Sequence, residues 1–207
     1  MTSVDNATKL AQFDEFFSID YTFNINARAI ELAQLPDYSQ FIANMPAPFK
    51  IASEINTLDQ NALRPLQTVA GVANQLMDYL NHQAQKIDLL VGYILGQQDD
   101  ESARFQAVKF GGGGIIFIDN NVSTFSTGDF IELKLFFPDE NSALFCIGEI
   151  VNCVVVDNES QYKVIFHHIR DEDREALVRN SLHQQSKQLQ ALAHQRNQTK
   201  SSEPKTE

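Results

Sequence analysis

The chain has 207 residues, of which 43% are hydrophobic and 10% aromatic, so it can bury a core and form one or two domains. Its formal charge of −11 and pI of about 4.8 argue against nucleic acid or an anionic membrane as the main partner, because both are polyanions. No apolar run approaches the ~20 residues that span a bilayer, and the first ten residues lack the basic and apolar regions of a secretory signal. We therefore expect a cytoplasmic protein with no membrane insertion and no nucleic-acid partner.

The first predicted element is a strand near the N-terminus. From Phe17 to Ile25, apolar and polar residues alternate strictly, which is the period of a half-buried strand. Residues 27–34 and 38–44 are compatible with short helices. The prolines within residues 45–49 predict an extended connector, because a proline disfavours the helical conformation of its predecessor. We group residues 1–58 as an N-terminal region of one strand and short helices.

A long helix with a coiled-coil period follows, and residues 59–100 form the second predicted region. Apolar residues recur there at alternating steps of three and four, which average to the heptad spacing and place the side chains in one seam. The predicted oligomerisation seam comprises Leu66, Val69, Ala73, Leu76, Leu80, Gln83, Ile87, Leu90 and Ile94. Gln83 is its polar member, and such a layer fixes register and oligomeric state at some cost in stability.

Two interpretations of this helix are open. A second apolar row widens the face, which suits a bundle larger than a dimer, or a helix held between a partner and its own domain. This second row comprises Ala70, Met77, Ala84 and Val91. We expect a homo-oligomer, with a tetramer favoured over a dimer. The alternative is a helix buried within one globular domain, because about four heptads is near the minimum for a coiled coil.

Several short strands follow the long helix. The predicted strands are residues 104–110, 115–118, 131–137 and 161–167, together with residues 144–156, which form one long apolar strand or two with a bend near Gly148-Glu149. Strands of this length separated by turn signals predict a small antiparallel barrel or sandwich. Asp171-Glu172-Asp173 then favours a helix start, because carboxylates stabilise the positive end of the helix dipole, and we expect this helix to reach about His194. Residues 101–195 thus form the third region, and residues 196–207 a tail that is disordered by composition.

The order of these motifs resembles a PilZ domain. The motifs that carry the resemblance are Gly111-Gly112-Gly113-Gly114-Ile115-Ile116-Phe117, Thr127-Gly128-Asp129, Gly148-Glu149-Ile150-Val151, Tyr162-Lys163-Val164-Ile165-Phe166 and the closing helix from Asp173 to Val178. They cover residues 102–190, and the preceding heptads resemble an atypical subclass that assembles through long helices into tetramers. The resemblance implies an α+β fold: a small antiparallel PilZ-like β-barrel with a C-terminal helix, preceded by the heptad-repeat helix and the N-terminal strand.

PilZ domains usually bind cyclic di-GMP, and the resemblance implies where this ligand would lie. The family uses an Arg-x-x-x-Arg segment ahead of the barrel and an Asp/Asn-x-Ser-x-x-Gly motif on the early strands, because guanidinium groups bind phosphate and guanine bidentately. Residues 97–103 contain no arginine, and the second motif reads Lys109-Phe110-Gly111-Gly112-Gly113-Gly114. The chain's Arg-x-x-x-Arg, Arg170 to Arg174, lies after the barrel motif and encloses three carboxylates. These departures predict that cyclic di-GMP does not bind tightly.

A reduced ligand site is the alternative. Its candidate residues are Arg104, Lys109, Gly111 and Gly114, with the glycine backbone amides cradling an anion. The four glycines lack the Gly-Lys-Ser/Thr of a phosphate loop, so we favour a bend or bulge in the barrel that needs positive φ or close backbone approach.

No catalytic or metal-binding constellation is apparent. His167 and His168 are adjacent on a strand and point to opposite faces, so they do not form a chelating pair. Cys146 and Cys153 fit reduced core thiols better than a disulfide or a metal site. We therefore expect no enzymatic activity, no catalytic residues, no cofactor and no bound metal.

Two functions from different classes follow. The first is a non-enzymatic, oligomeric adaptor that acts through protein partners in bacterial cyclic di-GMP-linked control of motility, pili or biofilm, a pathway implied by the resemblance. The second is a genuine cyclic di-GMP receptor that uses the reduced site. The glutamine-rich C-terminal helix carries Leu182, Leu189 and Leu192, and it either packs on the barrel or docks a partner.

Overall fold

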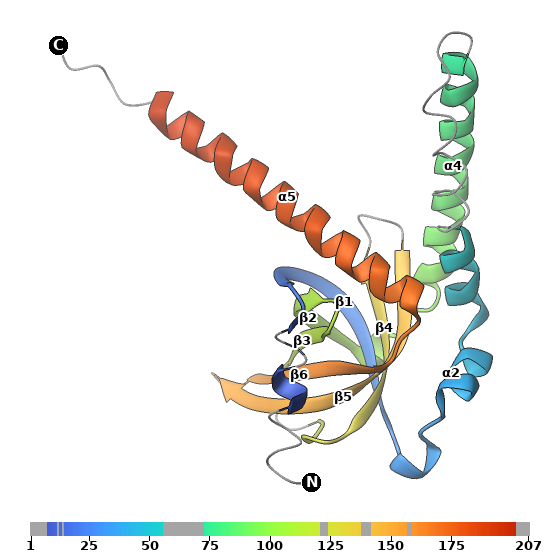
Figure 1. Ribbon diagram of the computed structural model, residues 1–207, viewed down its shortest axis with the longest axis vertical. Helices are drawn as coiled ribbons and strands as arrows, with labels where there is room; N and C mark the ends of the chain where they lie inside the picture. Colours follow the sequence, from blue (N-terminus) through green and yellow to red (C-terminus); the bar gives the residue numbers. More distant parts are fainter. Residues whose placement is uncertain are drawn as a thin grey trace, which may run out of the picture.

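A computed structural model shows a β-barrel from which two long helices, α4 and α5, extend in different directions (Figure 1). It describes residues 8–201 apart from residues 12, 14, 56–72, 121–123, 138–141 and 157–158. The strands are β1 Ser18–Ile30, β2 Arg104–Gly111, β3 Gly114–Asp119, β4 Phe130–Phe137, β5 Ser142–Val156 and β6 Glu159–His168. The helices are η1 Leu32–Gln34, α2 Tyr38–Asn44, α4 Ala73–Gly96, η2 Glu101–Ala103 and α5 Asp171–Ser201. None of the described helices is both long and apolar enough to cross a membrane.

Six antiparallel strands close the barrel in the order β1-β2-β3-β6-β5-β4. Alternate residues of each strand point inward, as in β4, whose pattern of buried and half-buried residues has period two. The interior side chains include Ile25, Phe110, Phe117, Leu133, Ile150 and Tyr162, all fully buried. The predicted fold, an antiparallel barrel with a C-terminal helix that follows a helical region and an N-terminal strand, is confirmed.

β1 is the strand that closes the barrel. The sequence placed it in a separate N-terminal region and predicted that it ends near Ile25, with a helix over residues 27–34. Instead, residues 25–30 pair with β4 while residues 18–26 pair with β2, so the strand continues to Ile30 and only residues 32–34 form a 3-10 helix. Periodicity shows which side chains are buried but not which strand pairs with which, and the long helix separates β1 from its partners in sequence.

A second core lies on the outer face of β4 and β5. It is made by α2, by a helix over residues 47–55 and by the end of α4, and its fully or nearly fully buried members include Phe41, Phe49, Leu95 and Phe145. The predicted helix over residues 38–44 is confirmed, but the extended connector over residues 45–49 is wrong. The carbonyl oxygen of Pro46 accepts hydrogen bonds from the amides of Phe49 and Lys50, so the prolines lie in a first helical turn, where no N–H is needed.

α5 covers one end of the barrel. Leu177 is buried in the barrel core, and the buried pair Arg170–Asp173 joins the start of the helix to the Phe49 carbonyl. The helix continues to Ser201, seven residues past the predicted end at His194, because no glycine or proline interrupts it. The predicted tail therefore begins as helix, and residues 202–207 lie outside the described residues.

Candidate functional site

α4 presents its predicted seam to solvent. The exposed fractions of the seam side chains are 57% for Leu76, 37% for Leu80, 45% for Ile87, 64% for Leu90 and 48% for Ile94. The helix extends from the barrel, and none of these side chains belongs to a core cluster of the described residues (Figure 1). The alternative of a helix buried in one globular domain is therefore wrong for this part of α4. Leu66 and Val69 lie outside the described residues, and nothing is described of the Ala73 side chain.

The C-terminal end of α4 is anchored to the outer core. Leu95 is 3% exposed, and Val91 packs against the same cluster of side chains. These two residues lie on a different side of the helix from Leu90 and Ile94. α4 is thus attached to its own domain along one side and leaves the seam open along another.

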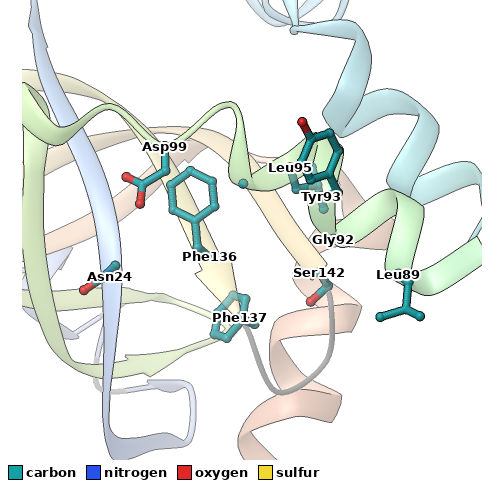
Figure 2. Close-up of a pocket in the computed structure, with 10 residues that line it drawn as sticks. Asn24, Leu89, Gly92, Tyr93, Leu95, Asp99, Phe136, Phe137 and Ser142 are labelled. Carbon is teal, nitrogen blue, oxygen red and sulfur yellow. The ribbon is translucent and has the colours of Figure 1, made fainter. Parts of the chain in front are cut away.

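A groove of about 410 Å³ lies where α4 meets the barrel (Figure 2). Its main lining residues are Leu89, Tyr93, Phe136, Phe137, Asn24 and Asp99. Leu89 and Tyr93 are both 69% exposed, and neither belongs to the seam. The lining combines apolar surface with one carboxylate, and it contains no lysine or arginine. Such a surface does not suit a phosphate ligand.

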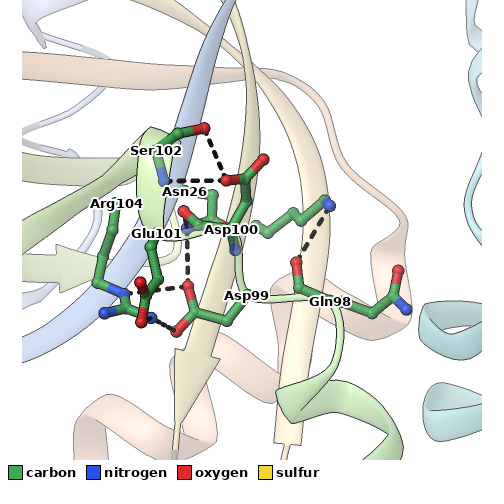
Figure 3. Close-up of polar contacts among 8 residues, drawn as sticks. Asn26, Gln98, Asp99, Asp100, Glu101, Ser102 and Arg104 are labelled. Atoms are coloured by element: carbon green, nitrogen blue, oxygen red, sulfur yellow. Dashed lines mark hydrogen bonds and ion pairs between the residues drawn. The ribbon is translucent and has the colours of Figure 1, made fainter.

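The linker between α4 and β2, residues 97–103, is fixed by Asn26 of β1 (Figure 3). Asn26 is 3% exposed; its amide nitrogen donates to the Asp99 carboxylate at 2.9 Å and to the Asp100 carbonyl at 3.1 Å, and its oxygen accepts from the Asp100 amide at 2.8 Å. One buried side chain therefore holds two consecutive residues of the linker against the barrel.

Basic residues of three neighbouring strands also bind this linker. Arg104 of β2 contacts the Asp99 carboxylate at 2.9 and 3.2 Å and Glu101 at 3.7 Å. Arg28 of β1 pairs with Asp100, and Lys134 of β4 donates to the Gln98 carbonyl at 3.2 Å.

These contacts shift the ionisation of the linker toward charged forms. Hydrogen bonds from Ser102, with a smaller contribution from Arg28, lower the pKa of Asp100. The hydrogen bond that Arg104 donates to Asp99 raises the pKa of Arg104. The segment that carries arginines in ligand-binding PilZ domains thus carries carboxylates here. Asp99 and Asp100 form ion pairs with Arg104 and Arg28 of the barrel.

The structure does not bring the predicted ligand residues together. Arg104 and Lys109 lie near opposite ends of β2, five residues apart, which corresponds to about 16 Å of strand. Lys109 pairs with Asp20 at 2.9 Å. A phosphate group that binds Lys109 and the following glycines would therefore not reach Arg104, and the reduced site remains a prediction.

The glycines of residues 111–114 allow close backbone approach. A Cβ on Gly111 would overlap the Phe17 carbonyl oxygen, and one on Gly114 would overlap the Val164 carbonyl oxygen. The interpretation of a tight strand approach is confirmed. Positive φ is not the reason, because among the described glycines only Gly128 has it, at 96°.

Arg170 and Arg174 serve structural roles. Arg170 donates to both Asp173 oxygens, at 2.7 and 3.0 Å, and Arg174 donates to the Gly112 carbonyl and lies 5.5 Å from the Phe16 ring centre. Burial raises the pKa of Asp173, and the bonds from Arg170 oppose this shift. Both guanidinium groups are therefore engaged, as expected for an Arg-x-x-x-Arg that does not bind ligand.

The rings of the two histidines of β6 lie 4.3 Å apart between their centres, so the expectation that they point to opposite faces is wrong, and each has a further partner. The His167 ring lies 4.9 Å from the Phe130 ring centre, and His168 bonds to the Pro36 carbonyl at 3.0 Å. Within the part of the chain that the structure describes, no group of three or more His, Cys, Asp or Glu residues is placed to hold a metal ion.

Sequence reasoning missed the barrel side of the linker contacts. The alternation over residues 17–25 makes Asn26 the next solvent-facing position, whereas Ile25, Asn26 and Ala27 are all buried. Arg28 and Lys134 belong to no motif that the sequence analysis identifies. No pattern in the sequence connects these residues with residues 98–100, because the contact depends on how the barrel closes.

The fold and these contacts define a class of protein: a small closed β-barrel, with a helix docked on its end and a long helix leading into its second strand. Residues 90–182 match the family model of the PilZ domain. Residues 90–182 are therefore a PilZ domain, with a degenerate ligand motif and a heptad-repeat helix that leads into it.

Solved structures similar to this chain include three proteins, and the first of them shares its fold. A tetrameric PilZ domain protein from Xanthomonas campestris, described as self-assembled through an unusual helical bundle, has 14% identity and a TM-score of 0.56 over 87% of this chain and 96% of that one. The inhibitor of motility MotI/DgrA from Bacillus subtilis has 16% identity and a TM-score of 0.38. The match covers 41% of this chain and 42% of that one. Apo MrkH from K. pneumoniae has 15% identity and a TM-score of 0.35 over 42% of this chain and 46% of that one. No curated protein sequence matches the chain.

Proposed function

We propose that this protein is a non-enzymatic PilZ-type adaptor in bacterial cyclic di-GMP-linked control of motility, pili or biofilm. It works in the cytoplasm as a homo-oligomer, a tetramer, and acts through protein partners without tight binding of cyclic di-GMP. The observation that carries this proposal is the exposed seam of α4. Leu76, Leu80, Ile87, Leu90 and Ile94 follow one heptad pattern, and burying each would contribute about 1.5–3 kcal/mol.

Two further observations support a bundle of several copies. α4 has 24 described residues, about 36 Å of helix, and its side toward Val91 and Leu95 already packs on its own domain. The Xanthomonas campestris protein of the same fold is described as assembling through a helical bundle. A contiguous apolar face of this length on a helix marks an interface.

The test is the mass of the protein in solution. The double variant Leu80→Asp with Ile87→Asp places charges in the seam, and we expect light scattering to give the 23.3 kDa monomer where the wild-type protein gives an oligomer. Leu32→Asp is the matched control, because Leu32 is 74% exposed and lies outside the seam. A wild-type protein that is already monomeric, or a double variant with unchanged mass, would show that the α4 seam does not assemble copies of this chain.

The second candidate is a cyclic di-GMP receptor, and the row of cations around the linker favours it. Arg104, Asn26 and Lys134 are register partners across β2, β1 and β4, so a displaced linker would leave two positive charges facing a ligand. The phosphates would replace Asp99 and Asp100 beside Arg104, and the other residues of the reduced site, Lys109, Gly111 and Gly114, would make a separate contact further along β2.

Calorimetric titration with cyclic di-GMP decides between the two functions. We expect no binding heat at low or moderate salt, because Arg104 is held by Asp99 and Lys109 by Asp20. Micromolar or tighter binding that is lost in Arg104→Ala would establish the receptor instead. Lys109→Ala distinguishes the glycine end of β2 from the linker end.

A further inference from the structure

The distal half of α5 extends beyond the barrel. Its first half is held there: Leu177, Ser181 and Gln184 are 0%, 1% and 6% exposed, and the Gln188 amide donates to the Asp20 carbonyl at 2.8 Å. The helix then continues to Ser201, 13 residues or about 20 Å further, away from the rest of the chain (Figure 1).

An apolar row follows a second side of this helix. Val178, Leu182, Leu189 and Leu192 are separated by steps of four, seven and three, which is a heptad spacing with Gln185 in the intermediate position. Their exposed fractions are 37%, 50%, 60% and 50%. These leucines therefore do not pack on the barrel, and of the two roles that the sequence left open for this helix, docking is the one that fits.

The charge of the same segment indicates what it docks. Residues 176–201 contain no aspartate or glutamate, in a chain of net charge −11. The basic residues of this segment are Arg179, Lys187, Arg196 and Lys200, and His183 and His194 accompany them. A helix that is locally basic on an otherwise acidic protein is electrostatically complementary to an acidic partner.

Two other partners for this row, a second copy of α5 and an anionic membrane, fit less well. The carboxylates of α5 all lie in residues 171–175, where the helix is held on the barrel, so pairing the distal halves of two α5 helices would place like charges along one another. An anionic membrane requires a broad apolar face, whereas this row is one residue wide, is interrupted by Gln185 and has Ser186 and Gln190 beside it.

We propose that Val178, Leu182, Leu189 and Leu192 bind an acidic amphipathic helix of a partner protein. The leucines of the partner pack on this row, and its carboxylates pair with Arg179 and the basic residues that follow. The inference rests on the adaptor function proposed above but uses a different helix. Assembly through α4 and docking through α5 are tested by separate variants, so either can fail alone.

The experiment is a fluorescence anisotropy titration of the full chain in its assembled state. The probe is a labelled synthetic helix with leucine at heptad positions a and d and glutamate elsewhere. We expect saturable binding that weakens when salt is raised from about 50 to about 300 mM, because screening shortens the range of the ion pairs. Leu182→Glu and Leu189→Glu should each weaken binding at least tenfold, and Leu32→Glu, an exposed leucine outside α5, should not.

Circular dichroism of the same variants checks that α5 remains folded. A comparison peptide with lysine in place of glutamate should bind at least tenfold more weakly than the acidic one. The proposal is overturned by absence of binding, by equal affinity for the two peptides, or by binding that survives Leu182→Glu and is lost in Leu80→Asp. Binding to phosphatidylglycerol vesicles in preference to the acidic peptide would also overturn it, in favour of a membrane surface.

Discussion

Cys146 lies at the centre of the barrel wall, opposite Leu133 in the β4–β5 pairing, and is fully buried. Burial raises the pKa of its thiol well above the usual range. An unfolded chain loses this proton above about pH 8.5, whereas the folded protein keeps it. The unfolded state then binds fewer protons, so the free energy of unfolding falls as pH rises above that value.

The predicted slope is up to about 1.4 kcal/mol per pH unit between about pH 8.5 and pH 10. Denaturant unfolding of the wild-type protein and of Cys146→Ala across this range measures it. The variant loses a roughly constant amount of stability from the small cavity, but the contribution of the thiol to the slope disappears. Parallel curves for the two proteins would show that the thiol titrates alike in both states.

Two glycines provide a matched pair of substitutions. Gly114→Ala places a methyl group against the Val164 carbonyl oxygen, where only backbone movement relieves the overlap. We expect it to destabilise the protein by about 2–4 kcal/mol. Gly96→Ala meets no atom within 4 Å at the last residue of α4, and should be neutral or stabilising by up to about 1 kcal/mol. Denaturation midpoints compare them, and similar losses at both positions would contradict the close approach of β3 to β6.

At the scale of elements, the linker between α4 and β2 sets how the long helix is held on the barrel. Asn26→Ala removes three hydrogen bonds and leaves the Asp100 amide without its side-chain acceptor. We expect a loss of about 1–3 kcal/mol and faster amide hydrogen exchange over residues 97–103. Asn24→Ala is the control, since Asn24 is exposed on the same strand. Unchanged exchange in Asn26→Ala would mean that the linker is fixed by its ion pairs instead.

The sequence predicted elements better than it predicted their partners. The period-two strands from Arg104 to His168 follow the burial of alternate residues, and the heptad spacing of α4 follows the period of a helix, so both leave a local pattern in the sequence. The pairing of β1 with β2 and β4, and the contact of Asn26 with Asp99, join segments on either side of the long helix. Such contacts depend on closure of the barrel, which leaves no local pattern.

The candidate site was predictable only in part. The absence of arginines before the barrel and the substitutions at Lys109 and Gly111 are visible in the sequence, and they predict weak ligand binding. That Asp99 forms an ion pair with Arg104, and Asp100 with Arg28, is visible only in the structure. Likewise, the sequence left two roles open for the leucines of α5, and their exposure argues against packing on the barrel.

For the whole molecule, one barrel carries two helices with separate exposed rows of apolar residues. α4 is anchored beside its seam by Leu95 and by the linker, and α5 is anchored beside its own row by Leu177. Because both anchors lie on the same rigid barrel, assembly through α4 would fix the spacing of the α5 helices in the oligomer. The proposed adaptor would then present several copies of the α5 helix, which would raise avidity without changing the affinity of each copy.

Gln83 tests whether the seam of α4 specifies the assembly as well as stabilising it. Gln83→Leu completes the apolar seam, so we expect the free energy of unfolding of the assembled protein to rise by about 1–4 kcal/mol and its Tm by several degrees. Loss of the polar layer also removes a determinant of stoichiometry. Gln85→Leu is the matched control, because Gln85 is exposed on the opposite side of the helix from Leu76 and Ile94. Thermal unfolding at several protein concentrations, with light scattering, separates stability from stoichiometry. A large fall in Tm for Gln83→Leu would instead show that this side chain makes specific hydrogen bonds within the bundle.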